Sequence, residues 1–149
     1  LPKDLYDKMI AAKNVGSGVA TLQQIFYGSI DMTLHDKYNP NEPRTTTDIV
    51  KELQNSITFT PYRDGTHMEA AFGHLNGYAA SYYGYLWALV YAQDIYSVFE
   101  KEGILNPEVG KRFRKYILAS GGDREPMELV KDFLGREPSA EAFYKSLGL

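Results

Sequence analysis

Cysteine is absent from this chain of 149 residues. Its absence excludes disulfides, thiolate chemistry and any zinc site built on cysteine ligands. It also fits a reducing compartment, so we expect a cytoplasmic protein. No run of apolar residues is long enough to cross a bilayer, and we expect no membrane partner.

Neither sign of charge is in large excess, because the formal net charge is only −3. Non-specific binding to nucleic acid needs a strongly basic surface, so we expect no nucleic-acid partner. One basic cluster, residues 111–115, admits a phosphate site. Charges that flank an apolar helical stripe are more often a solvated face, and we favour that interpretation.

Three common catalytic motifs are missing: His-Glu-x-x-His, the Gly-x-x-x-x-Gly-Lys phosphate loop and the Gly-x-Ser-x-Gly nucleophile elbow. The only histidines are His35, His67 and His74, and none has an acid at ligand spacing. We therefore expect no metal ligands in this chain. His35 is predicted to cap the end of a helix at the surface.

Apolar periodicity and capping signals predict an all-α fold of about seven helices with short connections. Ile57–Thr60 is predicted to be a buried extended connection, and Tyr62–Thr66 a turn with Asp-Gly as its signature. The expected helices are residues 3–13, 17–38, 49–56, 78–101, 107–120, 126–134 and 138–147. Gly103 should end the fourth, and Asn106 with Pro107 should begin the fifth.

Hydrogen-bonding aromatics are concentrated between Gly65 and Trp87, with four tyrosines within eight residues. On a helix, the spacing would place Tyr78, Tyr82 and Tyr85 on one face and turn Tyr83 away, towards Leu86 and Val90. A phenol keeps its proton at neutral pH and donates from a stiff side chain. Such a row can bind peptide carbonyls or stabilise an oxyanion.

Glycines precede this row, with Gly73 and Gly77 on either side of His74. Glycine lets a backbone bend close to a ligand, and His74 between them can donate or accept. Spacing alone favours core packing, since buried tyrosines need only one partner each. The three phenols combined with a Gly-His-Leu-Asn-Gly loop favour a binding site instead.

The segment Phe72–Trp87 closely resembles the signature loop and helix of the thimet oligopeptidase family, which includes neurolysin, oligopeptidase A, the peptidyl-dipeptidases and mitochondrial intermediate peptidase. The resemblance extends to the first residues and to the tail, through Gly121-Gly122 and Phe133–Pro138. It implies the C-terminal helical portion of a neurolysin-like fold. It also implies a zinc metallopeptidase that hydrolyses short peptides.

The same resemblance implies roles for residues. Tyr85 and Tyr78 would hydrogen-bond the scissile carbonyl and its oxyanion, and His74 and Tyr82 would contact the substrate backbone. The loop Gly73–Gly77 would close over the substrate. Only three residues separate His74 from Tyr78, one fewer than in many members, so the role carries to the tyrosines more directly than to His74.

The family's zinc motif precedes this segment, and zinc would be the cofactor of the parent enzyme with no ligand here. We therefore expect residues 1–149 to be the C-terminal helical part of a peptidase catalytic domain. Its partners would be short peptides and the missing zinc-binding part of the same protein. Alone, the chain should be inactive and prone to self-association. The alternative is a non-catalytic helical module that binds peptides or serves as a scaffold.

Overall fold

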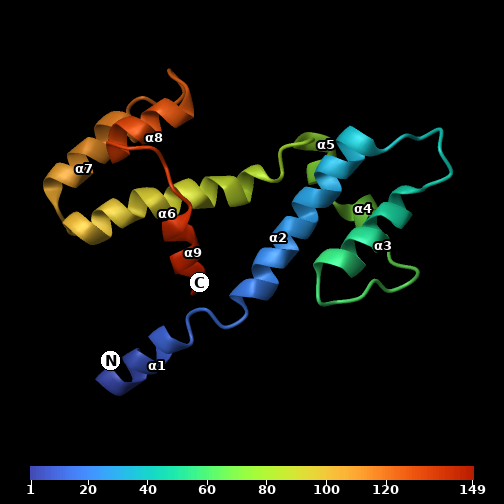
Figure 1. The fold of residues 1–149 in the computed structure, drawn as a ribbon, viewed down its shortest axis with the longest axis horizontal. Helices are drawn as coiled ribbons and strands as arrows, with labels where there is room; N and C mark the ends of the chain where they lie inside the picture. Colours follow the sequence, from blue (N-terminus) through green and yellow to red (C-terminus); the bar gives the residue numbers. More distant parts are fainter. The chain divides into compact units, whose positions relative to one another are not determined.

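A computed structural model describes all 149 residues, which form nine α-helices, two π-helical turns and no strand (Figure 1). The all-α prediction is confirmed, although the helices number nine rather than about seven. No helix is long and apolar enough to cross a membrane. The chain divides into two compact units, Leu1–Leu86 and Trp87–Leu149. The elements are α1 (Lys3–Ala11), α2 (Ser17–Met32), the π turn η1 (Thr33–Lys37), α3 (Thr46–Ile57), α4 (Met68–Ala71), α5 (His74–Gly77), α6 (Gly84–Glu102), α7 (Pro107–Phe113), the π turn η2 (Arg114–Leu118), α8 (Pro126–Leu134) and α9 (Glu141–Leu147).

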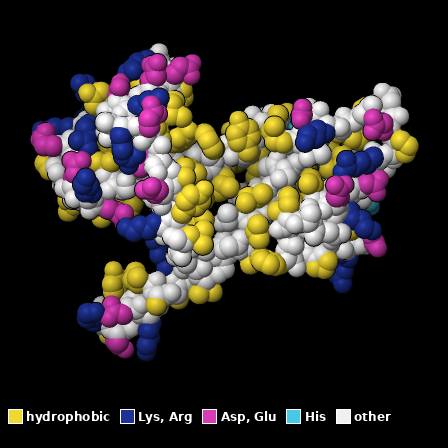
Figure 2. All heavy atoms as spheres, viewed as in Figure 1, with side chains coloured by type: hydrophobic (Ala, Val, Ile, Leu, Met, Phe, Trp, Pro, Cys, Tyr) yellow, Lys and Arg dark blue, Asp and Glu magenta, His cyan; other side chains and the backbone are white.

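The core of the first unit lies where α2 packs against α3 (Figure 1). Phe26 and Ile30 of α2 and Val50 of α3 are buried there. Burial of each such side chain stabilises the fold by about 1.5–3 kcal/mol. Helix α1, by contrast, has no buried residue, and its apolar side chains are exposed beside charged ones (Figure 2).

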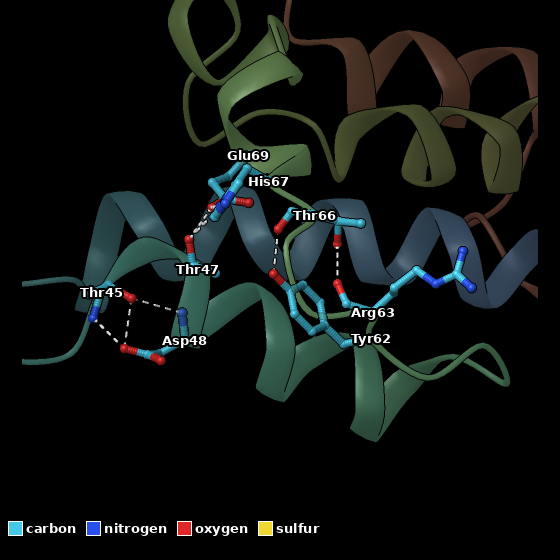
Figure 3. Close-up of polar contacts among 8 residues, drawn as sticks. All are labelled: Thr45, Thr47, Asp48, Tyr62, Arg63, Thr66, His67 and Glu69. Carbon is cyan, nitrogen blue, oxygen red and sulfur yellow. Dashed lines mark hydrogen bonds and ion pairs between the residues drawn. The ribbon is translucent and has the colours of Figure 1, made fainter.

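Helix α3 begins at Thr46, earlier than the expected start at residue 49, and its N-cap is Thr45. The Thr45 side chain accepts from the Asp48 N–H at 3.1 Å, and the Asp48 carboxylate accepts from the Thr45 N–H at 2.8 Å. This reciprocal pair is a capping box. The Thr47 hydroxyl instead donates to the Glu69 carboxylate (Figure 3).

The connection after α3 is only partly as predicted. The buried extended segment is wrong, since α3 includes Ile57 and the Phe59 side chain is 76% exposed. The turn is confirmed. The Thr66 N–H donates to the Arg63 carbonyl at 3.2 Å, and the Tyr62 hydroxyl donates to the Thr66 carbonyl (Figure 3). Gly65 has φ +84°, which glycine adopts without strain.

The predicted helix start at Tyr78 is wrong, because α6 begins at Gly84 and residues 78–83 form successive turns. The Ser81 N–H donates to the Tyr78 carbonyl at 3.2 Å, and Ala80 has φ +55°, which an α-helix does not allow. The glycine loop is itself mostly a helical turn, α5.

The second unit follows the local signals closely. Asn106 caps α7 by accepting from the Glu108 N–H at 3.0 Å, Pro107 occupies the first turn, and α8 begins at Pro126 as predicted. Gly103, at φ +108°, follows the last residue of α6. Helix α9 begins three residues later than expected. The buried residues of this unit are Val109, Leu129, Val130, Phe133, Phe143 and Asp94.

Candidate functional site

The aromatic residues of the first unit form one continuous cluster. The Tyr85 ring lies 5.6 Å from the Tyr78 ring and 5.1 Å from the Tyr82 ring, measured between centroids. The His74 ring lies 5.0 Å from Tyr82 and 5.9 Å from Tyr85. Phe72 continues the cluster, 5.3 Å from His74. Edge-to-face and tilted contacts of this kind stabilise by about 0.5–1.5 kcal/mol per pair beyond burial.

A shared helix face does not explain this cluster. Tyr85 lies in the first turn of α6, whereas Tyr78 and Tyr82 belong to the preceding turns. The prediction that the three phenols align on one helix is therefore wrong. The turns bring the rings together instead, and α5 adds His74 from the other side.

The three tyrosines differ sharply in exposure. Tyr78 and Tyr85 are 43% and 51% exposed, whereas Tyr82 is 8% exposed. The Tyr82 hydroxyl donates to Oε1 of Gln24 at 3.1 Å. Burial, together with the rings of Tyr27 and Tyr85, raises the pKa of Tyr82, while the bond to Gln24 opposes the shift. Tyr82 is thus a neutral, engaged donor at pH 7, and the two others face solvent.

A hollow of about 800 Å³ opens beside this cluster. Its lining includes His74, Tyr78 and Tyr82, together with Gly73 and Gly77. The rest of its lining is Tyr27, Met68, Ala71 and Phe72. An apolar hollow with a few convergent polar groups is the usual form of a small-ligand site.

Tyr83 does not line this hollow, and it lies in a turn rather than on the expected helix face. Its side chain is half exposed, and it lines a smaller hollow of about 270 Å³ with Leu86 and residues of α2. Its backbone passes close to α2, where a Cβ added to Gly28 would lie 3.5 Å from the Tyr83 Cα.

The residue that shapes the turn before α6 is Asp31 of α2, which the sequence did not single out. Its side chain is fully buried. One carboxylate oxygen accepts from the Ala80 N–H at 3.0 Å, and the other accepts from the Tyr82 N–H at 2.9 Å. His35 contacts the same carboxylate at 3.0 Å and donates to the Asp31 carbonyl at 2.8 Å. His35 is exposed in the turn that ends this helix, as predicted, and in addition its ring contacts the buried Asp31 carboxylate.

The other histidine, His67, belongs to a second polar group (Figure 3). Its Nδ1 lies 3.3 Å from the Thr47 hydroxyl and 3.6 Å from a carboxylate oxygen of Glu69. Glu69 is largely buried, and its second carboxylate oxygen has no partner. Sequence reasoning missed Glu69 as well.

The histidines do not combine into a metal centre. His35 pairs with Asp31, His67 with Glu69, and His74 with Tyr85. No group of three or more His, Cys, Asp or Glu side chains is placed to hold a metal ion. The donor set of this chain does not fit a zinc site.

Comparison with known proteins covers the whole chain. The family model "Peptidase family M3" matches residues 1–149. The chain is 43% identical to oligopeptidase A of Salmonella typhimurium, 37% to the thimet-like oligopeptidase of Dictyostelium discoideum and 36% to saccharolysin of Saccharomyces cerevisiae. Each alignment covers 100% of this chain but only 22%, 22% and 21% of the relative. The chain therefore spans about a fifth of the length of these relatives.

Proposed function

This chain belongs to peptidase family M3, and we propose that it is the helical, tyrosine-bearing part of a zinc-dependent metallo-oligopeptidase that hydrolyses short peptides. The names of its relatives support a peptidase, and the length that it covers in them supports a part of a larger protein. Because its own side chains do not fit zinc, the ligands would lie elsewhere in that protein. This chain would contribute residues that bind the peptide.

The hydroxyls of Tyr85 and Tyr78 are the proposed donors to the scissile carbonyl and to the oxyanion that forms from it. The observation that carries this assignment is the pair of half-exposed phenols with rings 5.6 Å apart, of which Tyr78 lines the hollow. Neutral phenols at fixed positions stabilise negative charge that develops in a transition state. Their stiff side chains also lose little entropy when they bind.

His74 and Tyr82 would hold the substrate backbone on either side of these donors. His74 presents its ring to the hollow from α5, which Gly73 and Gly77 bound. The Tyr82 hydroxyl is already donated to Gln24, so Tyr82 would act by packing its ring edge against the peptide. The glycines leave space for close approach, since a Cβ at either would meet nothing within 4 Å.

The test is Tyr85→Phe in the complete protein with a short peptide substrate. We expect kcat to fall by about 10²–10³ with little change in KM, because the lost bond strengthens in the transition state. Tyr78→Phe should act in the same direction. Tyr144→Phe, at an equally exposed tyrosine of the second unit, is the matched control and should leave kcat unchanged.

An unchanged kcat in Tyr85→Phe would remove the oxyanion role. If the complete wild-type protein binds peptides but hydrolyses none, the assignment as a peptidase fails. The alternative, a non-catalytic helical peptide-binding module, would then account for the same hollow.

A further inference from the structure

We propose that Asp31 is a positioning residue for catalysis, whose buried carboxylate holds the turn that aims Tyr78, Tyr82 and Tyr85. The proposal rests on the function proposed above. It concerns a residue that lies outside the hollow and touches no substrate.

Local backbone bonds close this turn, among them Ser81 N–H to the Tyr78 carbonyl, but one of its residues is strained. Ala80 sits at φ +55°, a left-handed conformation that costs a non-glycine residue about 1–2 kcal/mol. A strained residue persists only where surrounding contacts determine it. The contacts here are the Asp31 carboxylate oxygens, which accept from the N–H groups on both sides of Ser81, those of Ala80 and Tyr82.

The two bonds also explain why the helix begins late. An isolated segment with this tyrosine spacing would extend α6 towards Tyr78. In such a helix the Tyr82 N–H would donate to the Tyr78 carbonyl, whereas here the Asp31 carboxylate accepts it. The cluster of rings is thus a product of Asp31, 49 residues before Ala80 and 51 before Tyr82.

Asp31 is well suited to this task because its carboxylate is enclosed and bonded on both oxygens. Its side chain, on α2, is fully buried, and Nδ1 of His35 lies 3.0 Å from the carboxylate oxygen that accepts from Ala80. A charge-assisted bond to a backbone N–H is shorter and stronger than a neutral one. The carboxylate therefore fixes the backbone from which Tyr82 projects and which leads into Tyr85.

Asp31→Asn in the complete protein tests the proposal with minimal change of shape. The amide keeps one acceptor oxygen but turns its NH₂ group towards a backbone N–H, so one of the two bonds is lost. We expect kcat to fall by about 10- to 100-fold, as for the loss of one buried hydrogen bond, with KM changed less than about threefold. The Ala80 and Tyr82 amides should also exchange hydrogen faster.

Asp94→Asn is the matched control. Asp94 is the other buried carboxylate, and it also accepts from a backbone N–H, that of Ser139 at 2.7 Å, but in the second unit. It should lower stability without lowering kcat when both variants are assayed at a temperature where they are folded. His35→Ala removes only the contact between His35 and the Asp31 carboxylate. It replaces Asp31→Asn as the test variant if Asp31→Asn fails to fold.

The double variant Asp31→Asn/Tyr85→Phe separates positioning from general destabilisation. If Asp31 acts through the tyrosines, Asp31→Asn should lower kcat by a smaller factor in the Tyr85→Phe background than in the wild type. Two results would overturn the positioning role and leave the proposed function intact. One is that the losses of kcat in the two single variants multiply in the double variant. The other is an unchanged kcat in Asp31→Asn (or His35→Ala) while Tyr85→Phe is impaired. A Tyr85→Phe enzyme of full activity would overturn both.

Discussion

The Tyr85 hydroxyl lies 3.5 Å from Nε2 of His74, although 11 residues separate them in the chain. The contact joins α6 to α5 across the turns between them. It places the one histidine of the aromatic cluster beside one of its two half-exposed phenols. A peptide held by the imidazole would thus lie within reach of that phenol.

His74→Ala should therefore weaken peptide binding in the complete protein. We expect KM to rise by about fivefold to tenfold, the loss expected for one hydrogen bond with some packing, and kcat to fall less. Steady-state kinetics with a short peptide provide the measurement. His67→Ala is the control, because His67 contacts Thr47 and Glu69 rather than the cluster, and it should change neither parameter. Equal effects from the two variants would contradict a specific role for His74.

The start of α7 shows how far sequence alone reaches. Asn106 caps that helix by accepting from the nearby Glu108 N–H, and Pro107 occupies its first turn, so a short window contains all of the information. The start of α6 is different. The Ala80 and Tyr82 N–H groups of the turn before it donate to Asp31, which lies in another helix. No local propensity encodes that contact.

The same distinction applies to the candidate site. The sequence concentrates Tyr78, Tyr82 and Tyr85 near His74, and the structure brings all four rings together. The sequence does not reveal that Tyr82 is buried, because the partner of its hydroxyl is Gln24, far away in the chain on α2. The one available signal for Asp31 was that it is the only charged residue of α2, since a buried charge requires partners.

The isolated chain should neither bind zinc stoichiometrically nor cleave peptides. Its three histidines contact different partners, and none of them belongs to a group of three or more side chains that could hold a metal ion. Metal analysis after equilibration with zinc and dialysis, with a peptide assay beside it, checks both points. The complete protein should lose activity with a chelator and regain it with zinc. A peptide-cleaving zinc site in the chain alone would refute the proposal that the zinc ligands lie elsewhere in the complete protein.

Asp94 should make the second unit sensitive to acid. Hydrogen bonds from Arg136 lower the pKa of the Asp94 carboxyl, and the Ser139 N–H adds to this against the opposing effect of burial. Because the folded pKa lies below the unfolded value of about 3.9, the stabilisation is complete above that value. It is lost as the pH falls through the folded pKa.

Urea unfolding followed by the fluorescence of Trp87, the single tryptophan, measures this effect. At pH 7, Asp94→Asn should lower the free energy of unfolding by about 1–3 kcal/mol, since it weakens the bonds of a buried carboxylate. The difference between the two proteins should shrink below about pH 4. Glu137→Gln removes an exposed pair with Lys131 and should cost less than about 0.5 kcal/mol. A difference that stays constant down to pH 2 would contradict the linkage.

Two glycines of the second unit should respond oppositely to alanine. Gly110 lies inside α7, and an added Cβ would meet nothing within 4 Å. Gly110→Ala should therefore raise the free energy of unfolding by about 0.5–1 kcal/mol, since alanine loses less backbone entropy in a helix. Gly135 caps the end of α8 at φ +69°, and its N–H donates to the Lys131 carbonyl at 2.8 Å.

Gly135→Ala should lower the free energy of unfolding by about 1–2 kcal/mol, because alanine is strained in the left-handed conformation although space is available. The same Trp87 fluorescence experiment compares both variants under identical conditions. Since neither added methyl group meets a neighbour, a difference in sign isolates the backbone conformation as the cause. Stabilisation by Gly135→Ala would show that α8 does not end in this left-handed cap in solution.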